Sequence, residues 1–339
     1  MQNSRSMKEA KNLKSDMKNI AVLTSGGDSP GMNACIRAVV RTGISLDLKV
    51  YGIMNGYDGL IRDEFKLLDR ASVSNIIQRG GTILRTARSK EFYEKKGRET
   101  AFGNLKKRDI DGLIAIGGNG TFAGAREMMS EHDIAIIGIP GTIDNDLYGT
   151  DYTIGYDTAV NTAMEAIDKL RDTADSHSRL FFIEVMGRDA GFIALRSGIA
   201  AGAEDILVPE THTSISELID ILEKGFRKNK KSAIIIVSEG DDAGGAFEVA
   251  EKVKEKFSHY ETRVTVLGHI QRGGSPTAND RILAGTLGYE AVKALAEGKK
   301  GVMAGVVNRK IKFTPFRLSI KHHKDIRRDL LEMARVLSS

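Results

Sequence analysis

Short apolar runs alternate with amphipathic stretches along most of the chain. Four of these runs are apolar on both faces, which is typical of strands buried in a parallel sheet. They are residues 19–25, 48–53, 111–116 and 133–139. Between them, apolar residues spaced three and four positions apart predict helices. The alternation of strand and helix predicts an α/β fold with a mostly parallel sheet.

The same alternation starts again after about residue 155. A long helix is expected at 156–175, because apolar residues recur on one face of that stretch. Further strands are expected at 181–185, 206–210, 233–237 and 264–268, with a helix at 214–227. We therefore expect two similar Rossmann-like lobes of three layers each, with mostly parallel sheets.

The most informative loop, 140–146, follows one of the buried runs of the first half. At the carboxyl end of a parallel strand, where open α/β sheets bind ligands, it offers the hydroxyl of Thr142 and the carboxylates of Asp144 and Asp146. In extended backbone Asp144 and Asp146, separated by Asn145, would point the same way. Two close carboxylates suit a metal ion or a base with a partner, and a turn rich in Asx residues is the structural alternative.

Two glycine-rich turns lead from predicted strands into predicted helices. They are residues 26–33, Gly-Gly-Asp-Ser-Pro-Gly-Met-Asn, and residues 117–121, Gly-Gly-Asn-Gly-Thr. A strand, a glycine turn and a helix together aim backbone N–H groups at a phosphate. The first turn lacks both the G-x-G-x-x-G spacing and the lysine of a P-loop, so it is a generic phosphate turn or a tight connection. With the loop 140–146, the two turns predict one ligand crevice at the strand ends.

Basic residues stand beside several of the predicted loops. Arg79, Arg85 and Arg88 accompany a Gly-Gly pair, which suggests an anion site. His269 and Arg272 precede another Gly-Gly pair and suggest the same chemistry. For any one of these residues taken alone, a solvated surface charge is the simpler interpretation.

Composition narrows the range of functions. Lys and Arg number 50 against 45 acidic residues, a balance of +5 that suits anionic small substrates better than nucleic acid. The single cysteine, Cys35, excludes an internal disulfide and a cysteine-based zinc site. No stretch approaches a membrane span. Residues 1–17 are polar and lack the apolar segment of a signal peptide, so a flexible leader and a cytosolic location are expected.

Five motifs in this order resemble the phosphofructokinase family. They are residues 24–33, 117–120, 140–146, 186–188 and 268–276, and the resemblance covers nearly all of residues 18–320. The chain is similar to the short bacterial ATP-dependent 6-phosphofructokinases. The resemblance implies a homotetramer of two-lobed subunits, with the active site in the cleft between the lobes, that uses ATP and Mg²⁺ to phosphorylate the 1-hydroxyl of fructose 6-phosphate.

The resemblance also implies how the chain divides. The nucleotide-binding lobe is expected at 18–154 plus 268–320, and the sugar-phosphate-binding lobe at 155–267 plus 321–339.

Matching positions receive roles from the resemblance. Asp144 corresponds to the base that takes the proton of the sugar hydroxyl, and Thr142 to the residue that binds the transferred phosphoryl group. Asp146 supports magnesium and substrate. Arg88 and Arg188 stabilise the charge that develops on the transferring phosphate. These are the groups that phosphoryl transfer requires, because it depends mainly on positioning and charge neutralisation.

The resemblance also implies which residues contact the nucleotide, the sugar phosphate and magnesium. The nucleotide would contact Gly27, Tyr57, Arg88, Ser89, Gly118, Asn119, Gly120 and Thr121. The sugar phosphate would contact Thr142, Ile143, Asp144, Arg179, Met186, Gly187, Arg188, Glu239, Arg263, His269, Ile270, Gln271 and Arg272. In the family, the residues matching Arg179 and Arg263 reach across a subunit interface. Magnesium would be held with the help of Asn119 and Asp146.

Two departures from the family pattern stand out. Asn119 replaces the usual Asp of the second glycine turn, so an oxygen ligand remains but its charge is lost. The other departure lies in the implied effector site, whose matching residues are Arg37, Arg41, Arg70, Arg171, Gly202, Glu204, Lys228 and Lys230. There Ala71 stands in place of an aromatic residue and Asn75 in place of an acid. We therefore expect weak ADP activation, with control by small phosphorylated anions.

Three functions remain as hypotheses: an ATP-dependent kinase, a diphosphate-dependent phosphofructokinase and a catalytically weak regulatory protein. Diphosphate-dependent relatives commonly carry Asp at the position of Gly120 and Lys at that of Gly141. Side chains there would occupy the space of the α-phosphate, so the two glycines favour ATP. Asn119 motivates the regulatory hypothesis, against which Asp144 and Arg188 both remain.

Overall fold

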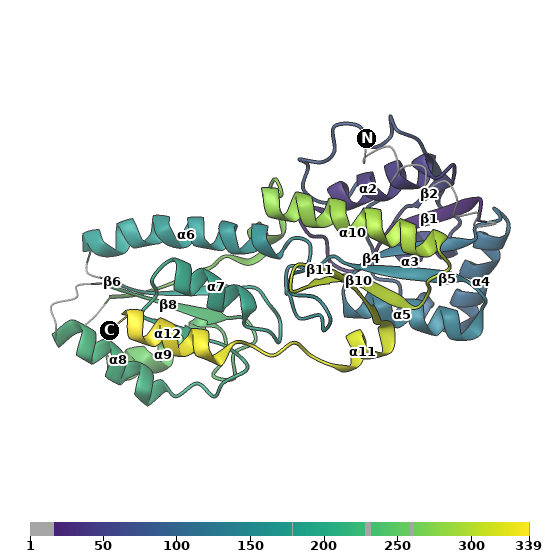
Figure 1. Ribbon diagram of the computed structural model, residues 1–339. Coiled ribbons are helices and arrows are strands. Elements are labelled where there is room, and N and C mark those ends of the chain that lie inside the picture. The colour runs from purple at the N-terminus through teal and green to yellow at the C-terminus, as the bar shows by residue number, and fades with distance from the viewer. Residues whose placement is uncertain (1–16, 178, 228–231, 258–260, 339) are drawn as a thin grey trace. The chain divides into compact units, whose positions relative to one another are not determined.

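The computed structural model describes residues 17–177, 179–227, 232–257 and 261–338, and Figure 1 traces them. They form two compact units. The first unit comprises the described residues up to Thr142 together with Leu147–Gly155 and Gly274–Lys324. The second comprises Ile143–Asp146, Tyr156–Gly273 and the described residues from Asp325 onward. Except for Met17, the expected leader lies outside the described residues.

One mixed sheet forms the centre of the first unit. In the described part of that unit its seven strands are ordered β11-β10-β5-β4-β1-β2-β3. The five inner strands are parallel, and the outer strands β3 and β11 are antiparallel to their neighbours. The strands are β1 (Asn19–Thr24), β2 (Lys49–Ile53), β3 (Phe65–Leu68), β4 (Gly112–Gly117), β5 (Ala135–Pro140), β10 (Val302–Val307) and β11 (Lys310–Pro315).

Helices cover both faces of this sheet, as Figure 1 shows. The residues of β1 alternate between two apolar clusters: Ile20 and Val22 join one, Ala21 and Leu23 the other. This two-sided burial explains the continuous apolar runs in the sequence. The first cluster includes residues of α2 (Met32–Ser45) and α10 (Ala278–Ala296). The second includes residues of α3 (Gly56–Ile61), η1 (Glu91–Tyr93), α4 (Lys95–Lys106), α5 (Asn119–Glu131) and α11 (Phe316–Lys321).

The second unit is built around a smaller parallel sheet. Its four strands, counted over the described residues, are ordered β7-β8-β6-β9. They are β6 (Arg179–Val185), β7 (Asp205–Leu207), β8 (Ala233–Ser238) and β9 (Glu261–Val266). Again β6 serves two cores: Phe181 and Ile183 pack with one face, Leu180 and Phe182 with the other.

The helices of the second unit divide between these faces. Residues of α6 (Tyr156–His177), α7 (Phe192–Ala200) and α12 (Arg328–Ser338) belong to the first core, and residues of α8 (Ile215–Arg227) and α9 (Ala246–Lys256) to the second. A short 3₁₀ helix, η2 (Gly268–Arg272), follows β9. The predicted α/β class with two mostly parallel sheets is therefore confirmed.

Some boundaries differ from the sequence prediction. The strand expected at 206–210 ends at Leu207, because Pro209 cannot donate a ladder hydrogen bond. Residues 143–146 and 268–273 lie with the second unit, whereas residues 155 and 321–324 lie with the first. The sequence boundaries placed each of these segments in the other lobe. No helix in the described ranges is long and apolar enough to span a bilayer.

Candidate active site

The loop after β5 is fixed on both sides where the strand ends. The N–H of Gly141 donates to the carbonyl of Gly117 at 3.0 Å, and the N–H of Ile154 donates to the carbonyl of Pro140 at 2.9 Å. The Thr153 hydroxyl donates to the carbonyl of Thr142 at 2.6 Å. These bonds hold the start of the loop rigidly at the carboxyl edge of the first sheet.

Beyond Thr142 the chain enters the second unit, and Asp144 is buried there with 5% of its surface exposed. Asn145 adopts a left-handed backbone with φ of 55°. The expectation that Asp144 and Asp146 point the same way is therefore not supported, since side chains alternate regularly only in extended backbone. Asn tolerates this conformation better than most residues do, which explains an Asn between the two acids.

Arg188 lies close to Asp144 in the second unit. Its Nε is 3.8 Å from Asp144 Oδ2, and its side chain is 57% exposed whereas that of Asp144 is 6% exposed. Arg188 also has a left-handed backbone, with φ of 53°. The N–H groups of Gly187 and Arg188 both donate to Glu239 Oε1, at 3.2 and 2.7 Å. A buried carboxylate beside a solvent-reaching guanidinium can take a proton while positive charge stands next to it.

Other residues expected at the sugar phosphate are distributed over η2 and β9. His269 and Ile270 are exposed and Arg272 is partly buried, but the side chain of Gln271 is fully buried. Gln271 therefore does not reach solvent as a ligand side chain must. On neighbouring strands, Arg179 Nε donates to Glu261 Oε2 at 2.7 Å, and Arg263 also pairs with Glu261. Hydrogen bonding from Arg179 lowers the pKa of Glu261.

The two glycine turns lie side by side in the first unit. Gly26 has φ of 88°, and Gly31, which precedes α2, has φ of 105°, so both positions favour glycine. The Thr121 hydroxyl donates to the carbonyl of Ser25 at 3.1 Å and so ties one turn to the other. The second turn opens directly into α5, which begins at Asn119. The N-terminus of a helix presents free N–H groups and a positive dipole end to an anion.

Tyr57 is hydrogen-bonded to this second turn. Its hydroxyl donates to the carbonyl of Thr121 at 2.6 Å, and its ring stacks on Phe92 with a centroid separation of 3.9 Å. The residue is only 5% exposed, and burial raises the pKa of its hydroxyl. Tyr57 was expected to contact the nucleotide. In this geometry it holds the first turn of α5, and one face of its ring is occupied by Phe92.

The two glycines that favour ATP differ in their surroundings. A Cβ added at Gly120 would meet nothing within 4 Å, so a side chain there would extend into open space. A Cβ added at Gly141 would lie 2.9 Å from Ile116 Cγ2 and 3.1 Å from Met32 Cε. A side chain at Gly141 would first meet Ile116 and Met32, so packing also favours glycine at this position, and the steric argument for ATP rests mainly on Gly120.

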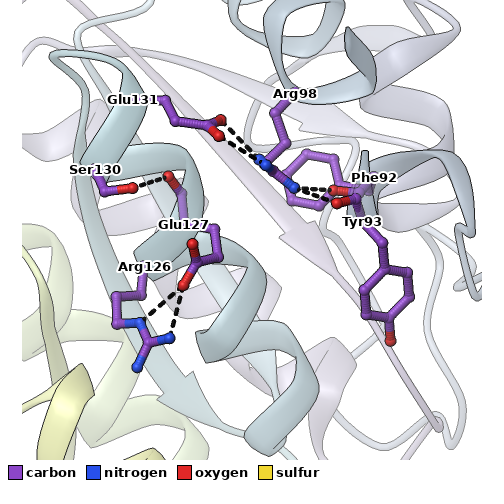
Figure 2. A network of polar contacts seen from close by, with 7 residues as sticks. All are labelled: Phe92, Tyr93, Arg98, Arg126, Glu127, Ser130 and Glu131. Atoms are coloured by element: carbon purple, nitrogen blue, oxygen red, sulfur yellow. Dashed lines mark hydrogen bonds and ion pairs between the residues drawn. The ribbon is translucent and has the colours of Figure 1, made fainter. Parts of the chain in front are cut away.

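A buried ion pair anchors the segment that carries Arg88 and Ser89. Figure 2 shows Arg98 of α4 facing Glu131 of α5, with Nε and Nη2 each 2.7 Å from a carboxylate oxygen. Arg98 Nη1 also donates to the carbonyls of Phe92 and Tyr93, at 2.9 and 2.7 Å. Ser89 Oγ accepts the N–H of Phe92 at 3.3 Å, while Arg88 is exposed.

Asn33 also has a role that the sequence analysis missed. It stands where a P-loop would carry Ser or Thr, and it is 1% exposed. Its Nδ2 donates to the carbonyls of Arg79 and Gly80 at 3.1 and 3.0 Å, and its Oδ1 accepts the N–H of Ile83 at 2.7 Å. The amide thus braces the 79–83 loop against α2. In the sequence this residue is only an Asn at the end of a glycine turn, and its burial becomes apparent only in the structure.

The expected effector residues fall on both units. On α2, burial and the neighbouring charge of Arg41 lower the pKa of Arg37, and the buried Nε of Arg41 has no hydrogen-bond partner in the described residues. Arg171 Nη2 donates to the carbonyls of Ala201 and Gly202. Glu204 accepts the N–H of Ile234 at 2.6 Å. Arg70 is exposed, and Lys228 and Lys230 lie outside the described residues.

Comparison with known proteins identifies what this geometry resembles. A family model described as phosphofructokinase matches residues 19–295. The chain is 56% identical over 322 residues to ATP-dependent 6-phosphofructokinase 1 of Thermus thermophilus, covering 95% of this chain and 100% of that one. It is 54% identical over 322 residues to ATP-dependent 6-phosphofructokinase 2 of Bacteroides thetaiotaomicron, covering 95% and 99%.

Solved structures show the same fold. Phosphofructokinase from Saccharomyces cerevisiae superimposes with a TM-score of 0.84 at 39% identity, covering 90% of this chain and 45% of the longer yeast chain. Pyrophosphate-dependent phosphofructokinase from Marinobacter aquaeolei superimposes with a TM-score of 0.80 at 23% identity, covering 94% and 91%. The second likeness concerns the fold alone.

Proposed function

Because the chain belongs to the phosphofructokinase family, we propose that it is an ATP-dependent 6-phosphofructokinase. It transfers the γ-phosphoryl group of ATP to the 1-hydroxyl of fructose 6-phosphate and yields fructose 1,6-bisphosphate and ADP, a step of glycolysis. The chain matches almost the whole length of relatives named for this activity, which supports ATP and fructose 6-phosphate as its substrates. The observation that carries the chemistry is Asp144, buried beside Arg188 in the loop that follows β5. The diphosphate-dependent and regulatory alternatives are not favoured.

Asp144 is the base of this proposal. Its carboxylate accepts the proton of the 1-hydroxyl as that oxygen attacks the γ-phosphorus. A carboxylate suffices for this task, because the transition state of phosphoryl transfer places little demand on the nucleophile. The loop start at Thr142 is fixed by the bonds at Gly141 and Thr153, so its hydroxyl can meet the transferred group without reorganisation. Asp146 follows on the same loop and supports magnesium and sugar.

Positive charge around the phosphates comes from three sources in this scheme. The proposal assigns Arg188, in the turn after β6, and Arg88, in the exposed loop before η1, to neutralise charge on the transferring group. In this proposal the start of α5 at Gly118 to Thr121 and the first turn at Gly27 would contact the nucleotide phosphates. Tyr57 contributes by fixing the carbonyl of Thr121.

The proposal includes Mg²⁺, which would be bound to the phosphates of ATP and would neutralise part of their charge. Among the described residues no three His, Cys, Asp or Glu side chains gather where a metal ion could be held. Mg²⁺ in kinases typically keeps waters and substrate phosphates as ligands and takes only one or two carboxylates from the protein. Asp146 supplies a carboxylate and Asn119 a neutral oxygen, which fits a metal delivered by the nucleotide and held less tightly than with Asp at position 119.

The sugar phosphate is clamped by cationic side chains of the second unit. His269 and Arg272 come from η2, and Arg179 and Arg263 from β6 and β9. Within one chain Arg179 and Arg263 are both paired with Glu261. These pairs must break when the two arginines bind the sugar phosphate of a neighbouring subunit. Because the matching residues of the family reach across a subunit interface, we include a homotetramer in the proposal, with the cytoplasm as its location.

One assay tests the proposal directly. Purified protein is supplied with fructose 6-phosphate and either ATP or diphosphate, over a range of Mg²⁺ concentrations, and fructose 1,6-bisphosphate is measured by coupled enzymes. Turnover with ATP, at least tenfold above that with diphosphate, is expected. Turnover only with diphosphate would replace the proposal with the diphosphate-dependent alternative, and no turnover with either donor would support the regulatory one.

A further inference from the structure

The backbone turn that carries Arg188 is held by side chains from two other segments of the second unit. Gly187 and Arg188 donate their N–H groups to Glu239 Oε1, which follows β8. The preceding N–H, that of Met186, donates to Gln271 Oε1 at 3.3 Å. Three consecutive backbone donors thus end on side chains far away in the sequence. The position of the Arg188 backbone depends on where these two side chains are.

Gln271 is built into the core of this arrangement. Its exposed fraction is 0%. Its oxygen receives the Met186 N–H, and its Nε2 donates to the carbonyl of Gly268 at 3.0 Å. Both ends of the amide are therefore engaged by backbone, and the side chain cannot reach a sugar phosphate. It connects η2, which carries His269 and Arg272, to the turn before Arg188.

We propose that Gln271 is a positioning residue that couples the sugar-phosphate segment η2 to the placement of Arg188. The inference rests on the proposed function, because the placement of Arg188 matters for phosphoryl transfer. Arg188 Nε stands 3.8 Å from Asp144 Oδ2, so a small shift of the 186–188 backbone changes the charge beside the base. Loss of the Gln271 amide should reduce turnover more than it weakens binding of fructose 6-phosphate, because Arg188 acts mainly on the transition state.

Kinetics of Gln271→Met test the coupling. Met has a similar length and no amide, so the two hydrogen bonds are lost with little change in volume. We expect kcat to fall about tenfold and KM for fructose 6-phosphate to change less than about threefold. In an Arg188→Ala background the same change should lower kcat by less than about twofold, because two residues that act as a unit are not additive. Equal losses in both backgrounds overturn the proposal.

A matched control is available at Gln78. This residue is exposed in the first unit, and its amide donates only to the carbonyl of Asn75 in the described structure. Gln78→Met makes the same chemical change without touching the 186–188 turn. It should leave kcat and KM within about 1.5-fold of the wild type. A tenfold loss in this variant would show that the kinetic effect is not specific to Gln271.

Hydrogen exchange separates this inference from the proposed function. Without any substrate, Gln271→Met should speed exchange in the peptide 185–190 about tenfold, and Gln78→Met should not change it. Gln271→Glu keeps an acceptor for the Met186 N–H but buries a carboxylate and loses the donor to the Gly268 carbonyl, so exchange should also rise and kcat should also fall. This variant tests the coupling if Gln271→Met does not fold. Unchanged exchange in the variant that folds overturns the inference. A wild type inactive on fructose 6-phosphate overturns the proposed function instead.

Discussion

The ion pair between Arg98 and Glu131 should be a major local contribution to the stability of the first unit. Arg98→Met removes the guanidinium and keeps much of the apolar stem. The change deletes two bonds to the Glu131 carboxylate and two to the carbonyls of Phe92 and Tyr93. It also removes the ion-pair partner of a carboxylate whose side chain is only 18% exposed. Removing one partner of a mostly buried pair is the costly way to break it.

The expected loss of unfolding free energy is about 3 kcal/mol, at the lower limit for a broken buried pair because both side chains keep some exposure. For a unit of this size that corresponds to a fall in melting temperature of roughly 6–12 °C. Figure 2 also shows a control pair, Arg126 and Glu127, on α5, the helix that carries Glu131. Its side chains are 48% and 46% exposed, so Arg126→Met should cost less than about 0.5 kcal/mol.

Thermal unfolding of both variants, followed at equal protein concentration, measures this difference. Hydrogen bonding from Arg98 lowers the pKa of Glu131. A carboxyl whose pKa is lowered by folding stabilises fully above its unfolded pKa of about 4.3, and that contribution is lost as pH falls through the folded value. The gap between wild type and Arg98→Met should therefore be constant from pH 7 to about pH 5 and shrink below about pH 4. Equal melting temperatures for Arg98→Met and Arg126→Met at pH 7 would refute the reasoning.

Three further variants examine the site. Asp144→Ser should lower turnover by about three orders of magnitude and leave the KM for fructose 6-phosphate within a few-fold, and a variant with a tenth of the activity would remove Asp144 from the role of base. Asn119→Asp should lower the Mg²⁺ concentration that gives half-maximal rate, because it restores a charged oxygen, and an unchanged requirement would place Asn119 away from the metal. Ala71→Tyr should strengthen activation by ADP by about 1 kcal/mol, because it restores a ring for stacking, and the shift of the fructose 6-phosphate saturation curve measures this change. Strong ADP activation of the unmodified protein would contradict the expected effector site.

The pattern of apolar residues predicted β1, β2, β4 and β5, because buried parallel strands are apolar on both faces, but it missed β10, which is also an inner strand of the first sheet. β1, β4 and β5 contribute residues to the cores on both sides of the first sheet, as their sequences require. The edge strands β3 and β11 were not predicted. Each is covered less completely, so polar residues such as Lys66 and Lys312 interrupt the apolar pattern. Periodicity identifies an element only where burial constrains it.

At the site, charged residues were easier to identify from the sequence than residues whose side chains hold the backbone in place. Asp144 and Arg188 were recognisable from motifs, and the structure places them together. The side chain of Asn33 donates to the carbonyl of Arg79, and that of Gln271 accepts the N–H of Met186. Both bonds join segments that lie far apart in the sequence. Nothing in the local pattern distinguishes such an amide from one that binds a ligand. Gly141 likewise matched a donor-specific position, but its surroundings are the apolar side chains of Ile116 and Met32.

The conformation of Arg188 unites these observations. A left-handed backbone costs a non-glycine residue roughly 1–2 kcal/mol, and an arginine gives no sequence signal that it will adopt one. Glu239 offsets this strain, because one carboxylate oxygen accepts the N–H groups of Gly187 and Arg188 together. Bonds from backbone donors to a charged acceptor are worth more than neutral ones, so the two together suffice. The family motif at 186–188 therefore does not by itself fix the conformation of Arg188. A turn that brings the Arg188 guanidinium near Asp144 thus also depends on an acid more than fifty residues later, and this hydrogen bonding gives Glu239 a structural role beside the proposed site.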